Sequence, residues 1–387
     1  MIPALIFALQ VSSMPEIHEY PASTQDSVSI EAIVTLPALN PAQRYLMGQA
    51  LTLAVQRTQE YGSRDVLRVL KTGTRFRLYQ AADHLRIGLT VEPKDLGTGL
   101  SLLRSVMTKP SFLEDTIKAK KSSVKDPWQP AYNGFSTMEV GLNQPDILQI
   151  WQGIMRPKNI SVAVGGNFTA NDPTEKWTTT WRGWNPPLET ALPLKYPPKQ
   201  IDLGNPVPLL IFDSKPIKLT RDNMPLYFLA ANALGVGKES ILWQIAREEM
   251  GLSYRQESFL LPTDEGWRFR IAFATDDQGV KPETIAKLRE KIRASCAALT
   301  QADLDHAIGL GKGYLKNSIP TMPLILGIGS AVTNDPNDQL YLRHYWLSKF
   351  GFVWSADSLY GQMQTAKLED LKKLLLQLVD QSDVHVL

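Results

Sequence analysis

The segment 233–254, ALGVGKESILWQIAREEMGLSY, joins a glycine-containing loop to a helix-forming stretch, a combination that could hold a phosphate group. A phosphate-binding P-loop requires G-x-x-x-x-G-K-[ST], because its backbone amides surround the phosphate and its hydroxyl binds magnesium. Here Glu239 follows Gly237 and Lys238, and Asn232 stands at the first glycine position. A carboxylate in place of the hydroxyl would repel the phosphate, so this loop is not expected to bind a nucleotide.

Residues that could bind zinc or perform hydrolysis do not form a recognisable set. No two histidines lie three to five residues apart, so no single helix or turn can present an imidazole pair to zinc. The motifs H-E-x-x-H, H-x-x-E-H and G-x-S-x-G are all absent. The single cysteine, Cys296, excludes an internal disulfide, and its helical spacing predicts a buried small residue. A site assembled from distant histidines is the alternative that remains.

The composition is typical of a globular protein with more than one domain. A chain of 387 residues has room for two or three domains. A net charge of +2 is too balanced to suggest a nucleic-acid or membrane-surface partner. The apolar N-terminus, MIPALIFALQVSS, is too short to span a membrane and lacks the basic start of a secretory signal. A cytoplasmic and a periplasmic location both remain open.

The proline-rich stretch 191–208 is predicted to be a linker between an N-terminal domain, 1–190, and a C-terminal domain, 209–387. Each half runs through the same order of strand, helix, paired strands and helix. The predicted strands are 27–36, 75–82, 84–91, 208–214, 254–261, 266–275 and 384–387, and the predicted helices are 41–62, 99–109, 225–235, 282–299 and 367–381. Thr300 and Asp303 form a capping box for one more helix. We therefore expect an α+β fold of two similar domains, each a mostly antiparallel sheet with helices packed on one face.

The segment 233–254 also carries a resemblance to a known family. Its helix, SILWQIAREEM, has an apolar stripe, Gly251 ends it, and Tyr254 opens a strand. This resembles the second-half signature of the pitrilysin/insulinase-type metallopeptidases, in which R-x-x-x-x-x-x-Y follows a glycine-rich loop. Arg247 and Tyr254 stand at the family's Arg/Tyr positions. The resemblance covers most of the chain, with this one specific motif.

The comparison with the family also shows a loss. Active members carry H-x-x-E-H on the first long helix and a distal glutamate, whereas here that helix is AQRYLMGQALTLAVQ and the later segment is the lysine-containing DTIKAKKSSVK. Ile241 and Met250 stand where active relatives often have arginine. The resemblance therefore implies that this chain holds no cofactor and that zinc is bound by a partner subunit.

The resemblance implies the zinc-less subunit of a heterodimeric metalloendopeptidase, similar to the alpha subunit of mitochondrial processing peptidase and to bacterial relatives, forming half of a clam-shell. Arg247 and Tyr254 would stabilise the transition state in the partner's site. Gly235, Gly237, Arg255 and Glu257 would contact a peptide or unfolded protein, added as a strand to a sheet edge. Neither nucleic acid nor a membrane span is expected. One alternative is a scaffold protein like the respiratory core proteins, and another is an autonomous hydrolase with a remote metal site.

Overall fold

The computed structural model describes residues 14–37, 39–81, 83–119, 131, 138–140, 143–182, 200–202, 204, 207–263, 265–316, 336–351 and 356–387. The chain divides into two units. The first comprises residues 1–122, 140–200 and 340–351, and the second comprises 123–139, 201–339 and 352–387. The sequence did not indicate that 340–351 groups with the first unit. Most of the predicted linker, 191–208, lies outside the described residues.

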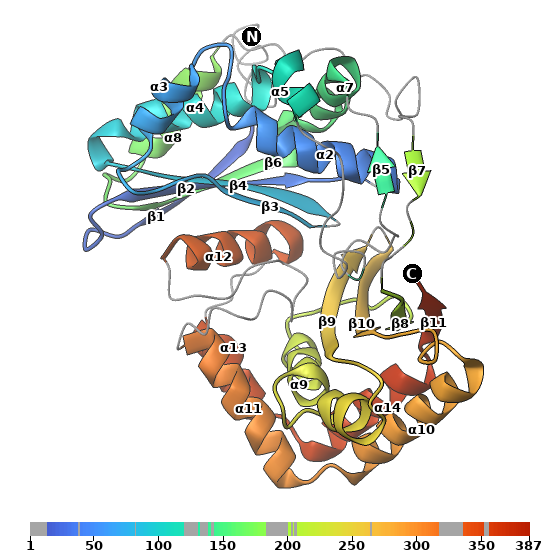
Figure 1. Cartoon of the computed structure of the whole chain (residues 1–387). Coiled ribbons are helices and arrows are strands. Elements are labelled where there is room, and N and C mark those ends of the chain that lie inside the picture. The colour runs from blue at the N-terminus through green and yellow to red at the C-terminus, as the bar shows by residue number, and fades with distance from the viewer. Residues whose placement is uncertain are drawn as a thin grey trace, which may run out of the picture. The chain divides into compact units, whose positions relative to one another are not determined.

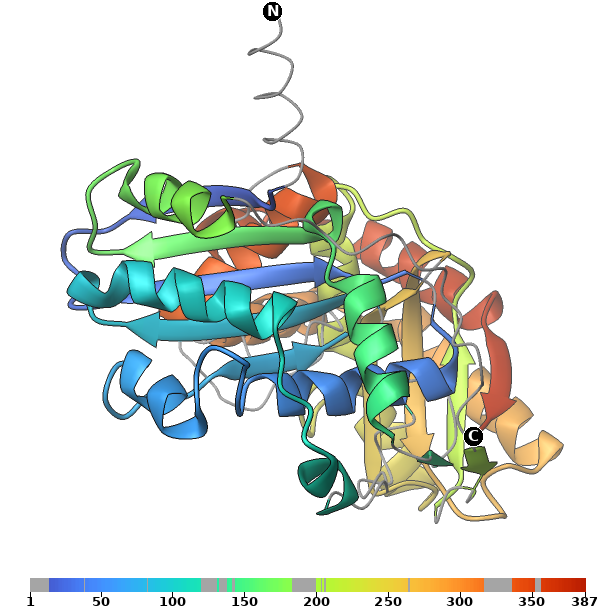
Figure 2. The same cartoon turned by 90° about the horizontal axis from the view of Figure 1, so that it is seen from above.

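The first unit is built on a five-stranded sheet of order β1-β6-β2-β4-β3, in which only the β1–β6 pair is parallel. Helices α3, α4, α7 and α8 lie on one side of this sheet (Figure 1), and from above they cover its strands (Figure 2). The strands are β1 Glu16–Pro21, β2 Val28–Thr35, β3 Arg77–Gln80, β4 His84–Val91 and β6 Ile160–Gly166. The helices are α2 Pro41–Ala54, α3 Ser63–Val69, α4 Leu96–Thr108, α5 Glu114–Ala119, α7 Gln144–Ile154 and α8 Asp172–Trp181, with short 3₁₀ turns at Pro93–Asp95 and Pro157–Asn159.

One further helix, α12 Pro336–Phe350, lies on the opposite face of the first unit's sheet (Figure 1). Its part within this unit meets the sheet through polar contacts. The Tyr341 hydroxyl is 2.5 Å from Nε2 of His84, and the Arg86 guanidinium lies 4.2 Å from the Tyr341 ring centroid. Lys349 forms an ion pair of 2.9 Å with Asp83. The second face of the sheet is therefore covered as well, by a helix far away in sequence.

The second unit contains a sheet of order β11-β8-β10-β9, all antiparallel. Its strands are β8 Leu209–Asp213, β9 Arg255–Thr263, β10 Gly266–Ala274 and β11 Asp383–Val386. Its helices are α9 Met224–Gly235, a π-helix η3 Trp243–Glu249, α10 Pro282–Ala298, α11 Gln301–Lys316, α13 Ala356–Met363 and α14 Leu368–Asp380. The strands β5 Met138–Val140 and β7 Gln200–Asp202 form a separate two-stranded sheet.

These elements confirm the predicted α+β class with mostly antiparallel sheets. The Thr300–Asp303 capping box is present, because the Asp303 carboxylate accepts hydrogen bonds of 2.7 Å from the Thr300 amide and hydroxyl. The predicted helix 41–62 is wrong in its last turns, since α2 ends at Ala54 and Gly62 instead precedes α3. The Thr58 hydroxyl accepts hydrogen bonds from the amides of Glu60 and Tyr61, and such local bonds compete with helix.

No helix among the described residues is both long enough and apolar enough to cross a membrane.

Candidate functional site

The glycine-containing loop of the second unit ends in a tight turn that starts the next helix. Gly237 has a φ of +80°, in the left-handed region that glycine adopts without strain. The Ser240 hydroxyl donates a hydrogen bond of 2.8 Å to the Gly237 carbonyl and accepts one of 3.3 Å from the Trp243 amide. The predicted apolar stripe is confirmed, since its four members are buried: Ile241, Leu242, Ile245 and Ala246. The helix is therefore anchored on one side.

The helix differs from the prediction in its winding. From Trp243 to Glu249 it is a π-helix rather than an α-helix, and the Met250 amide donates to the carbonyl of Ile245, five residues earlier. Gly251, with a φ of +58°, follows the end of this helix, as predicted. Single π-turns of this kind occur frequently at functional sites. This turn carries Arg247, so the local backbone is unusual at the residue of greatest interest.

Arg247 and Tyr254 lie together in the structure. The Arg247 guanidinium carbon is 5.2 Å from the Tyr254 ring centroid and 4.2 Å from the Trp243 ring centroid. Tyr254 is 83% exposed, which is unusual for a tyrosine and leaves its hydroxyl accessible to another molecule. The Arg247 side chain is 36% exposed. A cation and a phenol therefore stand side by side at the surface of this unit.

The strand that follows, β9, carries the two predicted peptide-contacting side chains. Arg255 and Glu257 point to the same face of β9, and Nε of Arg255 is 3.2 Å from the Glu257 carboxylate. Their side chains are 46% and 28% exposed. Among the described strands, β9 is the last in the order of the sheet and begins one residue after Tyr254. Strand β9 is therefore an edge strand of the sheet as far as the structure describes it.

Gly235 serves a purpose that the sequence did not reveal. A Cβ atom at this position would lie 2.4 Å from the backbone nitrogen and 2.5 Å from the hydroxyl of Ser258 in β9. The Ser258 hydroxyl in turn donates a hydrogen bond of 3.0 Å to the carbonyl of Ala231 in α9. Gly235 therefore faces the chain's own strand, on the side opposite Arg255 and Glu257, and the close approach it permits is internal. By contrast, the space beside Gly237 is open within 4 Å.

The cysteine and the histidines, which were considered as possible nucleophiles or metal ligands, do not lie beside Arg247 and Tyr254. Burial, with a smaller contribution from the Asp380 carboxylate, raises the pKa of Cys296 to about 12, so the thiol is not a nucleophile at neutral pH. His18 and His344 come together in the first unit with ring centroids 5.2 Å apart, a pair that their positions in the sequence did not indicate. His306 lies on α11, half exposed, 3.4 Å from Glu239.

The part of the chain that the structure describes does not provide a site for a zinc ion. Among the described residues, no three His, Cys, Asp or Glu side chains are grouped so that they could hold a metal. Helix α2, the first helix of the chain among the described residues, has the sequence PAQRYLMGQALTLA, which contains neither histidine nor glutamate. No catalytic step is therefore assigned to a metal held by this chain.

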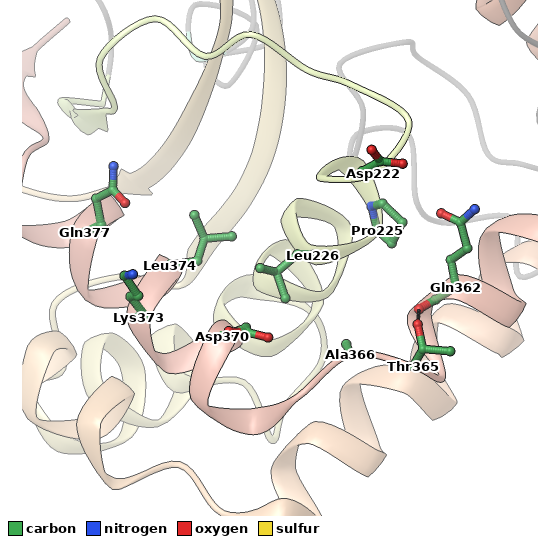
Figure 3. A pocket seen from close by; sticks show the side chains of 10 residues that line it. All are labelled: Asp222, Pro225, Leu226, Gln362, Thr365, Ala366, Asp370, Lys373, Leu374 and Gln377. Atoms are coloured by element: carbon green, nitrogen blue, oxygen red, sulfur yellow. Dashed lines mark hydrogen bonds between the residues drawn. The ribbon is translucent and has the colours of Figure 1, made fainter.

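A groove of about 480 Å³ lies elsewhere in the second unit, beside the start of α9 and the start of α14 (Figure 3). Leu226 and Leu374 line it together with Asp222 and Asp370. None of its lining residues belongs to the segment 235–257. Its lining also includes Lys373 and polar side chains such as Gln362, and it contains neither arginine nor tyrosine.

Two contacts at the site were not predicted from the sequence. The Trp243 indole nitrogen donates a hydrogen bond of 3.0 Å to the Glu248 carboxylate, and the same carboxylate lies 4.0 Å from the Arg247 guanidinium. In the sequence, the only indication of these contacts was Trp243, an aromatic residue four positions before Arg247. That Trp243 can contact both Arg247 and Glu248 follows from the π-turn, which the local sequence does not reveal.

Comparisons with known proteins agree with this description. Residues 141–309 match the family model described as the peptidase M16 inactive domain, and this range includes Arg247 and Tyr254. A protease from Helicobacter pylori is 14% identical, with 97% of each chain covered and a TM-score of 0.67. A peptidase M16 inactive domain from Pseudomonas fluorescens is also 14% identical at a TM-score of 0.67, with 97% of this chain and 95% of that chain covered.

A predicted insulinase family protease from Yersinia pestis is 13% identical, with 95% of this chain and 89% of that chain covered and a TM-score of 0.57. A comparison with curated proteins found no match. At such low identity the solved structures show a shared fold. Together with the family-model match, they confirm that this chain is similar to the M16 peptidases, the pitrilysin/insulinase type, and that the matched region corresponds to their inactive domain.

Proposed function

We propose that this chain is the non-catalytic subunit of a heterodimeric zinc metalloendopeptidase and that it supplies Arg247 and Tyr254 to the site of a zinc-bearing partner. The observation that carries the proposal is the proximity of these two groups, 5.2 Å from guanidinium to ring, at an exposed surface. The match of residues 141–309 to an M16 inactive domain supports it. So does the absence of H-x-x-E-H from the sequence.

The chemistry assigned to this chain is stabilisation of the oxyanion. When water attacks a peptide carbonyl, negative charge develops on the carbonyl oxygen, and donors held at that position lower the barrier. The Tyr254 hydroxyl can donate a hydrogen bond, and Arg247 can donate one while also supplying a positive charge. Zinc in the partner would supply the activated water.

Substrate contacts are proposed for the residues around this pair. Gly237 leaves open space beside the loop, and Arg255 and Glu257 present opposite charges on one face of β9. An extended peptide lying along the sheet edge would pass Tyr254 before these two side chains. For Gly235 the proposed substrate contact is limited to its backbone, because the absence of a side chain there is already needed for packing against Ser258.

The test is reconstitution with the native partner. The tagged chain is used to capture its partner from the source organism, and the partner's sequence is searched for H-x-x-E-H. We expect neither subunit alone to cleave a quenched fluorescent peptide and the mixture to cleave it. A partner without a zinc motif, or a complex that never cleaves peptides, would contradict the proposal and favour a scaffold. Stoichiometric zinc in the purified single chain would instead favour an autonomous hydrolase.

A further inference from the structure

The π-helix η3 places three side chains on one face. Trp243 lies four residues before Arg247 and five residues before Glu248, and it contacts both. In an α-helix, residues five apart differ by about 140° around the axis and do not meet. A π-helix bonds each residue to the one five positions away, so residues four and five apart both lie over the first. The unusual winding is therefore what allows this contact set.

Arg247 is enclosed by these neighbours. Its guanidinium carbon lies 4.2 Å from the Trp243 ring centroid and 5.2 Å from that of Tyr254, and both distances are within the range of a cation–π contact. The Trp243 indole is itself fixed by its hydrogen bond of 3.0 Å to Glu248. The helix that carries Arg247 is itself held in place, because Ile245 and Ala246 on its other side are buried in the core.

Holding the Arg247 side chain in one orientation has a consequence for catalysis. An arginine side chain at a surface samples many rotamers, and a donor that must first be ordered contributes less to the transition state than one already in place. Stacking on the rings involves the face of the Arg247 guanidinium group and does not occupy the N–H groups, which point outward in its plane; of these, Nε lies 4.0 Å from the Glu248 carboxylate. Stacking thus restricts the arginine without using its hydrogen-bonding capacity.

We infer that Trp243 is a positioning residue for Arg247, with Glu248 orienting the indole, and that the π-turn is the structural device that brings them together. This inference rests on the proposed function of Arg247. It goes beyond that function because it assigns a role to Trp243, a side chain to which the proposed function gives none.

The first arm of the test needs no partner. NMR of the arginine Nε–Hε groups in the intact chain, with the Arg247 signal assigned from its loss in Arg247→Lys, reports the ring current of Trp243. We expect a signal shifted upfield in the wild type, a similar shift in Trp243→Phe, and a clearly smaller shift in Trp243→Leu, where only the Tyr254 ring remains beside the guanidinium group. An Arg247 signal that is the same in the wild type and in Trp243→Leu would overturn the inference and leave the proposed function standing.

The second arm measures peptide cleavage by the complex with the captured zinc-bearing subunit. Trp243→Leu should lower kcat about fivefold, the effect expected for one exposed cation–π contact, with KM unchanged, and Trp243→Phe should restore most of it. Glu249→Gln is the matched control, because the Glu249 carboxylate pairs with Lys291 and not with Arg247. Unaltered kcat in Trp243→Leu, when Arg247→Ala is impaired, would overturn the inference. Unaltered kcat in Arg247→Ala would instead show that the proposed function itself is wrong.

Discussion

Gly235 shows how closely the end of α9 approaches the edge strand of the second unit. In Gly235→Ala the new methyl group would overlap the Ser258 amide, which is backbone and cannot turn aside. We expect the free energy of unfolding to fall by about 1–3 kcal/mol, measured by urea denaturation. Gly361→Ala is the control, because Gly361 lies within α13 and an added Cβ meets nothing within 4 Å. It should be neutral or slightly stabilising. Equal stability in the two variants would refute this account of Gly235.

His344 is a second residue whose surroundings have a measurable consequence. Burial, together with the nearby His18, lowers the pKa of His344 from 6.5 to about 4. As pH falls below 6.5, the unfolded chain therefore binds a proton before the folded chain does, and the free energy of unfolding decreases. Between pH 7.5 and pH 5, this residue alone should lower the free energy of unfolding by about 2 kcal/mol.

The comparison of wild type with His344→Leu isolates this contribution. The variant replaces the ring with an apolar group that cannot titrate, so its urea midpoint should change less between pH 7.5 and pH 5. Asp83, whose pKa is lowered by its neighbours His84 and Lys349 against an opposing effect of burial, loses its stabilising charge only at more acid pH and does not confuse this range. A variant with the full wild-type pH dependence would contradict the assignment.

At the scale of elements, the first unit's sheet contains a buried charge network that links three strands. The Glu31 carboxylate of β2 is fully buried and accepts hydrogen bonds from Arg86 of β4 and Arg77 of β3, at 2.9 and 2.8 Å. Gly88, opposite Glu31 in the register, leaves the room that the carboxylate needs. The same carboxylate thus connects β2 to the adjacent strand β4 and to β3, the strand beyond it.

Removing this carboxylate should be costly. Glu31→Ala leaves two guanidinium groups in or near the interior without their anion, and we expect a loss of about 3–5 kcal/mol in the free energy of unfolding. Glu60→Ala offers a matched comparison, because Glu60 also pairs with two cations, Arg104 and Lys109, but is 30% exposed. That change should cost about 1 kcal/mol or less. Equal losses, measured by urea denaturation, would show that burial does not control the strength of the Glu31 network.

Periodicity predicted most elements because it reflects local burial. The alternating and apolar patterns of β2, β4, β8 and β10 correspond to strands buried on both faces. Three features could not be predicted in this way. The early end of α2 follows from the local hydrogen bonds of the Thr58 hydroxyl, and the place of α12 depends on contacts such as Tyr341 to His84, 257 residues apart. The π-turn leaves no mark in the spacing of the apolar residues, which fits an α-helix equally well.

The candidate site shows the same division. The spacing of Arg247 and Tyr254 was readable from the sequence through its resemblance to a family, and the structure brings the two side chains together. The internal packing of Gly235 against Ser258 was not readable, because a glycine needed for close approach looks the same whether the neighbour is the chain's own strand or a ligand.

At the scale of the whole molecule, the proposed function makes this chain one subunit of a two-chain enzyme. The chain has two units with the M16 fold, a region matching the inactive domain, and an exposed arginine–tyrosine pair. It offers no zinc motif in its sequence. In the proposed function, another chain supplies the metal and the activated water.

The most direct measurement is therefore kcat for peptide cleavage by the complex with its zinc-bearing partner, for wild type, Arg247→Ala, Tyr254→Phe and the double variant. We expect each single change to lower kcat about 100-fold, the loss typical of one oxyanion donor, while complex formation is unchanged. The double variant should lose less than the product of the two, because the groups act on one oxygen. Wild-type kcat in both single variants would contradict the account.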